Sequence, residues 1–161
     1  ISHMLAAAFG KHAGVKVTHV PYKGAADMMR ALAAGEIQMQ ISTTTATLEK
    51  MQQTGRVQYL AVASAKRSTF APGVPTLRES LPEMIALDSW SALFAPAGVP
   101  ERTAQALGTA VQQAMAAQGV AERLSVQYIS PVYLDSSMLK AEMAKAATAQ
   151  ARLRNESGIG S

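Results

Sequence analysis

The alternation of helical and strand-like segments constrains this chain most, because it runs unbroken through the first 63 residues. The strand-like segments are β-branched or alternately apolar and lie at 15–20, 37–41 and 57–63. A helical pattern precedes each of them and ends in a glycine: Gly14, Gly35 and Gly55. Glycine readily adopts the left-handed conformation that ends a helix. This order of elements predicts an α/β fold with parallel strands.

The middle of the chain changes character and predicts a division into two parts. Residues 70–82 hold three prolines and leave room for one short helix at 76–80. An extended segment at 85–95 carries the only tryptophan, Trp90, which is expected either at a hinge or in the core. The break at 97–100 is a candidate boundary between lobes. The elements expected beyond it are helices at 101–117, 120–124 and 136–154 and a strand at 126–129.

Composition narrows the class of protein. The 161 residues suit one compact domain or two small lobes, and 48% are hydrophobic while only 5% are aromatic, so the core is expected to be aliphatic. The absence of cysteine excludes disulfides, thiolate metal sites and thiol catalysis. The net charge of +4 is scattered, which is weak evidence for nucleic acid and suits a small anionic ligand. No apolar run reaches the ~20 residues of a membrane span, and no signal-peptide pattern stands at the start.

Motifs for catalysis are missing from the sequence. The three histidines are not grouped with carboxylates at metal-ligand spacing, and no serine stands in a nucleophile motif. No glycine-rich phosphate loop is present. We therefore expect no catalytic residue, no metal and no cofactor, and an enzymatic function is poorly supported.

Three polar segments at element boundaries are the candidate ligand-binding positions. A helix start offers free N–H groups and the positive end of the helix dipole, which suit a carboxylate. The end of a strand in an open α/β sheet is where such folds place ligands. The candidates are Ser2 and His3 at a helix start; Tyr22, Lys23 and Gly24 between a strand and a helix; and Ser42, Thr43 and Thr44 after the second strand.

Each candidate also has a purely structural interpretation. Ser2 could only cap its own helix, and residues 22–24 could form an ordinary turn with a solvated lysine. Thr44 or Thr45 is expected to cap the helix that follows, but four consecutive small polar residues exceed what one cap requires.

Several ordered motifs resemble the TctC-type receptors of tripartite tricarboxylate transporters, also called the Bug family. The resemblance begins at His19-Val20-Pro21-Tyr22-Lys23-Gly24 and covers nearly the whole chain. It continues through Ala31-Leu32, Gly35, Leu60-Ala61-Val62-Ala63-Ser64, Lys66-Arg67-Ser68, Val74-Pro75-Thr76, Glu79, Trp90, Phe94-Ala95-Pro96-Ala97-Gly98-Val99-Pro100 and Gly158-Ile159.

The resemblance implies a type II periplasmic binding protein fold, of which this chain is the C-terminal half. Residues 1–89 would form the second ligand-binding lobe. Residues 90–161 would cross the hinge and supply C-terminal helices to the first lobe. Ser2 and His3 match a family helix start that holds carboxylate, whereas relatives often carry Asp or Asn where Ser42–Thr44 stand.

The implied function is a periplasmic receptor that captures a small carboxylate and delivers it to membrane transporter subunits. Nucleic acid and direct membrane insertion are not expected. The alternatives are the effector domain of a transcription regulator, which would need a DNA-binding domain upstream, and an enzyme on a similar α/β scaffold. A half-receptor is also expected to bind carboxylates poorly on its own and to expose apolar helix surface that favours self-association.

Overall fold

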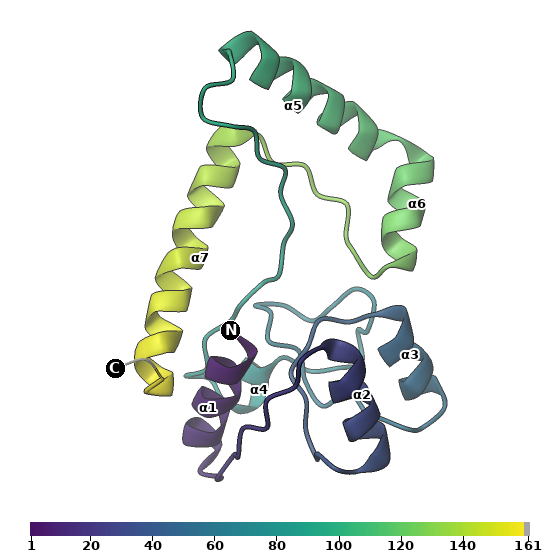
Figure 1. The fold of residues 1–161 in the computed structure, drawn as a ribbon, viewed down its shortest axis with the longest axis vertical. Helices are drawn as coiled ribbons and strands as arrows, with labels where there is room; N and C mark the ends of the chain where they lie inside the picture. The colour runs from purple at the N-terminus through teal and green to yellow at the C-terminus, as the bar shows by residue number, and fades with distance from the viewer. Residues whose placement is uncertain (160–161) are drawn as a thin grey trace. The chain divides into compact units, whose positions relative to one another are not determined.

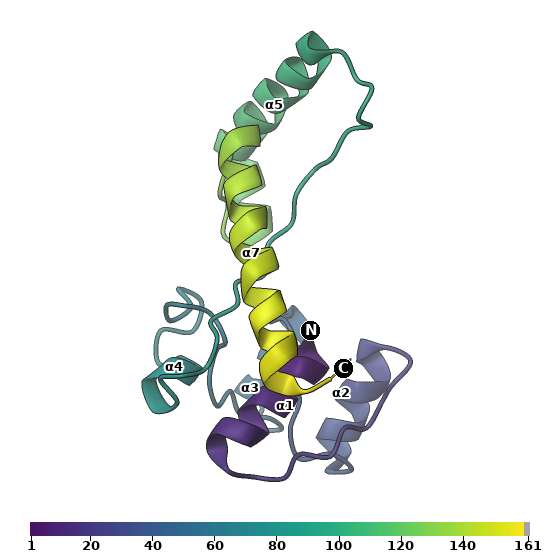
Figure 2. The same ribbon diagram turned by 90° about the vertical axis from the view of Figure 1, so that its left-hand side faces the viewer.

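The computed structural model describes residues 1–159 and is built from helices joined by extended segments (Figures 1 and 2). The helices are α1 (Ser2–Ala13), α2 (Ala25–Ala34), α3 (Ala46–Gln53), α4 (Leu77–Ser80), α5 (Glu101–Ala116), α6 (Gln118–Val126) and α7 (Ser136–Ser157). None of these helices is both long and apolar enough to cross a bilayer.

The helix boundaries follow the local signals in the sequence. Gly14 and Gly35 end α1 and α2 in the left-handed conformation, with φ of 67° and 76°. After α2, the N–H groups of Gly35 and Glu36 donate to carbonyls of the last helical turn at 3.1 and 2.9 Å. A side chain with a Cβ would cost about 1–2 kcal/mol in this conformation. The predicted helix ends at these two glycines are confirmed.

A capping box starts the short helix α4. The N–H of Thr76 donates to the Glu79 carboxylate at 2.8 Å, while the Thr76 side chain accepts from the Glu79 backbone N–H. Thr76 is itself buried and forms a parallel β-bridge with Val62. The short helix expected at 76–80 is therefore present, and its cap is tied to a segment that precedes it by more than ten residues.

The prediction that three segments in the first part of the chain form hydrogen-bonded β-strands is wrong. Residues 15–20, 37–41 and 57–63 are extended, but the bridge between Val62 and Thr76 is the one β-pairing in residues 1–159. The strand expected at 126–129 is replaced by the end of α6 and a turn in which Tyr128 has a φ of 60°. The pattern of side chains favours an extended backbone locally. A β-strand also needs a neighbouring extended segment close enough to form backbone hydrogen bonds with it.

The chain forms two compact units. Unit 1 comprises Ile1–Ser89 and the chain from Ala146 onward, and unit 2 comprises Trp90–Lys145, so that α7 contributes to both. The assignment of residues 1–89 and 90–161 to two receptor lobes stays a prediction. In unit 1 an aliphatic core forms as the composition predicts. Its buried residues are Leu5, Ala8, Met84, Ile85 and Leu153.

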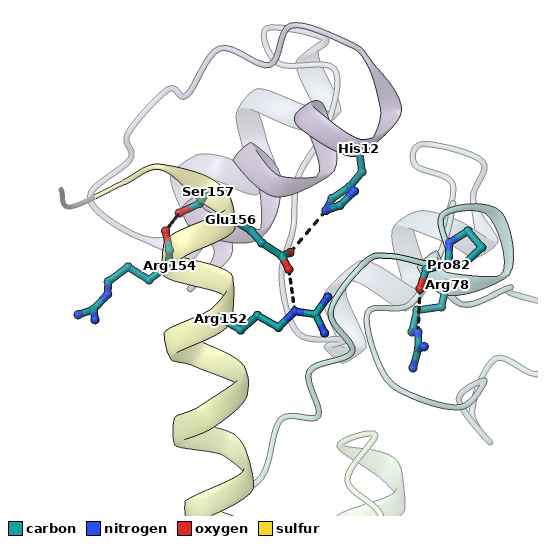
Figure 3. A network of polar contacts seen from close by, with 7 residues as sticks. All are labelled: His12, Arg78, Pro82, Arg152, Arg154, Glu156 and Ser157. Carbon is teal, nitrogen blue, oxygen red and sulfur yellow. Dashed lines mark hydrogen bonds and ion pairs between the residues drawn. The ribbon is translucent and has the colours of Figure 1, made fainter.

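A polar contact in unit 1 reinforces the packing of α1 against the end of α7 (Figure 3). His12 Nε2 lies 3.5 Å from Glu156 Oε2, and the other oxygen of Glu156 accepts from Arg152 Nε at 2.7 Å. His12 and Glu156 are 144 positions apart in the sequence. The first and last helices are thus held together by both the apolar core and this polar contact.

Candidate carboxylate-binding site

The first turn of α1 has free hydrogen-bond donors. The helix begins at Ser2, so Ile1 occupies the N-cap position. The apolar side chain of Ile1 provides no hydrogen bond to cap the helix. The expectation that Ser2 caps its own helix is therefore wrong, since a capping residue must precede the first helical one. Within the described chain, the N–H groups of Ser2, His3 and Met4 have no acceptor, and the first donation is from Leu5 to Ile1 at 2.9 Å.

A pair of stacked histidines links this helix start to the segment that leads to Tyr22. The rings of His3 and His19 are nearly parallel, with an interplanar angle of 11° and centroids 3.7 Å apart. Both residues are exposed. Because His19 lies two residues before Pro21, the stack places the first turn of α1 beside the chain that enters the second candidate segment. No pattern in the sequence indicates this stacking, since the two histidines are 16 positions apart.

The second candidate segment lines a cavity of about 450 Å³ in unit 1. Tyr22 is half-buried and Lys23 is exposed, while Gly24 is the extended N-cap residue of α2. The cavity is lined by Pro21, Tyr22, Lys23, Asp27, Arg30, Ala31, Ala34 and Glu36. Tyr22 and Lys23 are thus at a hollow surface, whereas Gly24 contributes the start of the adjacent helix.

The charges around this cavity are not equivalent. Asp27 and Arg30 form an ion pair one turn apart on α2 and largely neutralise each other. Lys23 and Glu36 have no ion-pair partner among residues 1–159. The cavity therefore presents one free ammonium and one free carboxylate. An anionic group is attracted toward Lys23, and a second negative charge placed near Glu36 would be repelled.

The third candidate segment is exposed and extended before α3. Thr45 caps α3 by accepting from Leu48 N–H at 3.3 Å, which confirms that one of the two candidate threonines is the cap. Ser42 donates to the carbonyl of Thr43 at 3.3 Å. In the part of the chain that the structure covers, no hydrogen bond joins Ser42, Thr43 or Thr44 to the other candidates. Their role in ligand binding remains a prediction.

Sequence reasoning missed four polar residues near these segments. Asp27, Arg30 and Glu36 line the cavity. The oppositely charged Asp27 and Arg30, three positions apart just after the Tyr22–Gly24 segment, were the feature of the sequence that could have indicated a charged surface here. Gln40 was interpreted as the polar face of a strand. Its amide nitrogen and oxygen are both buried without a hydrogen-bond partner within the described residues. The alternation of polar and apolar residues predicts which face of a strand a residue lies on. It does not predict whether the polar atoms of that residue find hydrogen-bond partners.

The fold of the chain is similar to about half of a periplasmic binding protein. The structure of Rpa4515 from R. palustris with adipate superposes with a TM-score of 0.83 at 25% identity, covering 98% of this chain and 52% of that chain. The periplasmic binding protein BugD superposes with a TM-score of 0.71 at 24% identity over 98% of this chain and 53% of that chain. The expected fold class is thereby confirmed.

The sequence comparison identifies the family. The model of the tripartite tricarboxylate transporter family receptor, TctC, matches residues 1–158, and the chain belongs to this family. Protein BugT from Bordetella pertussis is 31% identical over 132 residues, which are 81% of this chain and 40% of that protein. This chain thus spans about half of the solved relatives and less than half of BugT.

Proposed function

We propose that this chain is the C-terminal half of a periplasmic receptor that captures a small carboxylate for the membrane subunits of a tripartite tricarboxylate transporter. The match of the receptor family model to residues 1–158 carries this proposal. The relative Rpa4515 was solved with adipate, a dicarboxylate. In this function the ligand is held and released without a chemical reaction.

The first turn of α1 supports the proposal because its donors suit an anion. The N–H groups of Ser2, His3 and Met4 have no backbone acceptor in the described chain, and no side chain caps this helix. A helix start carries the equivalent of about half a positive charge, and hydrogen bonds to a charged group contribute roughly 1.5–3 kcal/mol each. A carboxylate bound here would satisfy these donors together.

The cavity at Lys23 supports the choice of a carboxylate with limited charge. The Lys23 ammonium is the cation of the cavity that the Asp27–Arg30 pair leaves free. Glu36 on the same cavity disfavours additional negative charge nearby. We therefore assign Lys23 to electrostatic attraction of the ligand, Tyr22 to apolar contact, and Gly24 to the adjacent helix start. Ser42, Thr43 and Thr44 would supply hydroxyl donors from a second loop.

In the complete receptor we assign residues 1–89 to the second lobe and residues 90–161 to the hinge crossing and the helices of the first lobe. Ligand contacts made from both lobes would favour a closed arrangement over an open one. The transporter subunits would recognise the closed receptor. Because this chain provides only part of the cleft, it should bind carboxylates much more weakly than the complete receptor.

Isothermal titration with adipate tests the role of Lys23 in the complete receptor. The Lys23→Met variant should lose at least about tenfold in affinity, the equivalent of one charge-assisted contact. Lys16→Met is the matched control, because Lys16 is an exposed lysine of unit 1 outside the cavity. Equal affinities for Lys23→Met and the unmodified receptor would contradict the proposed role of Lys23 in the site.

A thermal-shift screen of mono-, di- and tricarboxylates tests the function itself. If none of these ligands raises the melting temperature of the complete receptor, the proposed function is contradicted.

A further inference from the structure

The stacked rings of His3 and His19 are brought together by packing between α1 and the chain that follows it. The N–H of Val15 donates to the carbonyl of Gly10 at 2.9 Å, and a methyl group of Val17 lies against the Gly10 backbone. The chain therefore turns back along α1 after the helix ends (Figure 1). This return carries His19 to the first turn of the helix, where its ring centroid lies 3.7 Å from that of His3.

The part of the sequence that forms this pair contains cations but no acid. Residues 1–26 hold no aspartate and no glutamate. Among residues 1–159, no carboxylate lies within ion-pair distance of either stacked ring, whereas His12 near the other end of α1 contacts Glu156. The other charged side chains on α1 and on the chain up to α2 are the exposed Lys11, Lys16 and Lys23. A proton on the stacked pair therefore has no counter-charge in the described chain.

Two imidazoles in contact do not accept two protons independently. Histidine acquires its positive charge between about pH 8 and pH 5. One imidazolium can stack on the neutral ring beside it, but a second positive charge at 3.7 Å is repelled. The neighbouring lysines oppose protonation further. An anion bound close to the pair would reverse this balance, because it provides the attraction that the chain itself lacks.

We propose that His19 is a positioning residue of the carboxylate site and that the His3–His19 pair takes up a proton when the carboxylate binds. In the proposed function, on which this inference rests, the ligand lies at the first turn of α1. His19 fixes the ring of His3 in that turn, beside N–H groups that lack a backbone acceptor. Ligand binding and protonation then strengthen each other to the same extent. The affinity for a carboxylate should therefore rise as the pH falls from 8 to 6.5.

Isothermal titration of the complete receptor at pH 6.5 and pH 8 tests the proton uptake. The ligand is adipate or, if another carboxylate gives a larger thermal shift, that carboxylate. The affinity should be at least about threefold higher at pH 6.5. Binding heats at pH 6.5 in buffers of different ionisation enthalpy should show a net uptake of protons. The double variant His3→Phe/His19→Phe keeps two stacked rings without a titratable nitrogen, so its affinity should be the same at both pH values.

Single substitutions of His19 test the positioning role separately. His19→Ala removes the stack and should lower the affinity at pH 8 at least about threefold. His19→Phe restores a ring against His3 and should bind at pH 8 as the unmodified receptor does. Because His19 is exposed, both variants should keep the melting temperature of the ligand-free receptor. His12→Gln is the matched control, since His12 contacts Glu156, and it should change neither the affinity nor its pH dependence.

The outcomes separate this inference from the proposed function. If the ligand binds equally well at both pH values, or if the double variant keeps the pH dependence, the proton uptake by the pair is wrong while the receptor function stands. Equal affinities for His19→Ala and the unmodified receptor would overturn the positioning role. A receptor that binds no carboxylate at either pH contradicts the proposed function and this inference together.

Discussion

The guanidinium of Arg67 holds the carboxylate of Glu79 through two nitrogens. Arg67 Nε lies 2.9 Å from Glu79 Oε1, and Arg67 Nη2 lies 2.5 Å from Glu79 Oε2. The hydrogen bond from Arg67, followed by the one from the Thr76 backbone, lowers the pKa of Glu79 to about 2. One carboxylate thus joins the loop at Arg67 to the capping box of α4.

Acid should therefore weaken unit 1 through Glu79. A carboxyl whose pKa is lower in the folded state than in the unfolded state stabilises the fold above its unfolded value of about 4.5. That contribution is lost as the pH falls from about 4.5 to about 2. Urea unfolding between pH 7 and pH 3 should show a shallower decline for Glu79→Gln than for the unmodified chain. Glu83→Gln is the control, because Glu83 is an exposed carboxylate without an ion-pair partner in the described chain, and its stability should decline as that of the unmodified chain does. Identical pH dependence for all three proteins would contradict the role of Glu79.

Gly10 should not tolerate a side chain, although it lies inside a helix. A Cβ at this position would lie 2.9 Å from the carbonyl oxygen of Val15 and 3.0 Å from a methyl group of Val17. The clash should outweigh the ~1 kcal/mol that alanine gains over glycine in a helix, so Gly10→Ala should destabilise unit 1 in urea unfolding. Gly108→Ala in α5 meets only an ordinary contact at 3.7 Å from the Tyr133 hydroxyl and should raise helix content. A gain in stability for Gly10→Ala would show that the chain after α1 can move away.

Leu153 should be essential for the attachment of α7 to unit 1. Its side chain is fully buried and belongs to the core that contains Leu5, Ala8 and Met84. Leu153→Ala should lower the free energy of unfolding by about 2–5 kcal/mol, because it removes apolar contacts and leaves a cavity. Met143→Ala on the same helix serves as the control, since Met143 is exposed, and it should change stability by less than about 0.5 kcal/mol. Similar losses for both variants would place the core elsewhere.

Gln40 should be replaceable by an apolar residue with a gain in stability. Both polar atoms of its amide are buried without a partner in residues 1–159. A buried unsatisfied polar group costs about 1–3 kcal/mol, so Gln40→Met should raise the melting temperature of the ligand-free chain. Gln58→Met, at an exposed glutamine, is the matched control and should have little effect. A loss of stability in Gln40→Met alone would indicate that the amide is satisfied in solution.

The sequence predicted the helices well because their signals are local. Gly14, Gly35 and Thr45 each act within one or two turns of the helix that they end or begin. Asp135 behaves similarly, as its carboxylate accepts from the N–H groups of Ser137 and Met138 at 2.8 Å near the start of α7. These bonds lower the pKa of Asp135, with the bond from Met138 having the largest effect.

The candidate site was only partly predictable from the sequence. Tyr22 and Lys23 are predicted ligand-binding positions because a strand-like segment ends and a helix begins there, and the structure places both of them on the lining of a cavity. The stacking of His3 on His19 and the free carboxylate of Glu36 depend on how α1, α2 and the extended chain pack together. Neither relation leaves a periodic or spaced pattern that could be recognised along the chain.

By itself, the sequence determined the helix ends, the aliphatic character of the core and the family to which the chain belongs. Only the tertiary structure decided which extended segments have a partner, as Val62 does with Thr76 and residues 90–95 do not. It also decided that the buried side chains gather in unit 1 and that Gln40 lacks a hydrogen-bond partner among the described residues. The physical reason is the separation along the chain of the residues that interact. Caps and helix ends are fixed by atoms a few residues apart, whereas pairing and burial depend on residues brought together from distant parts of the chain.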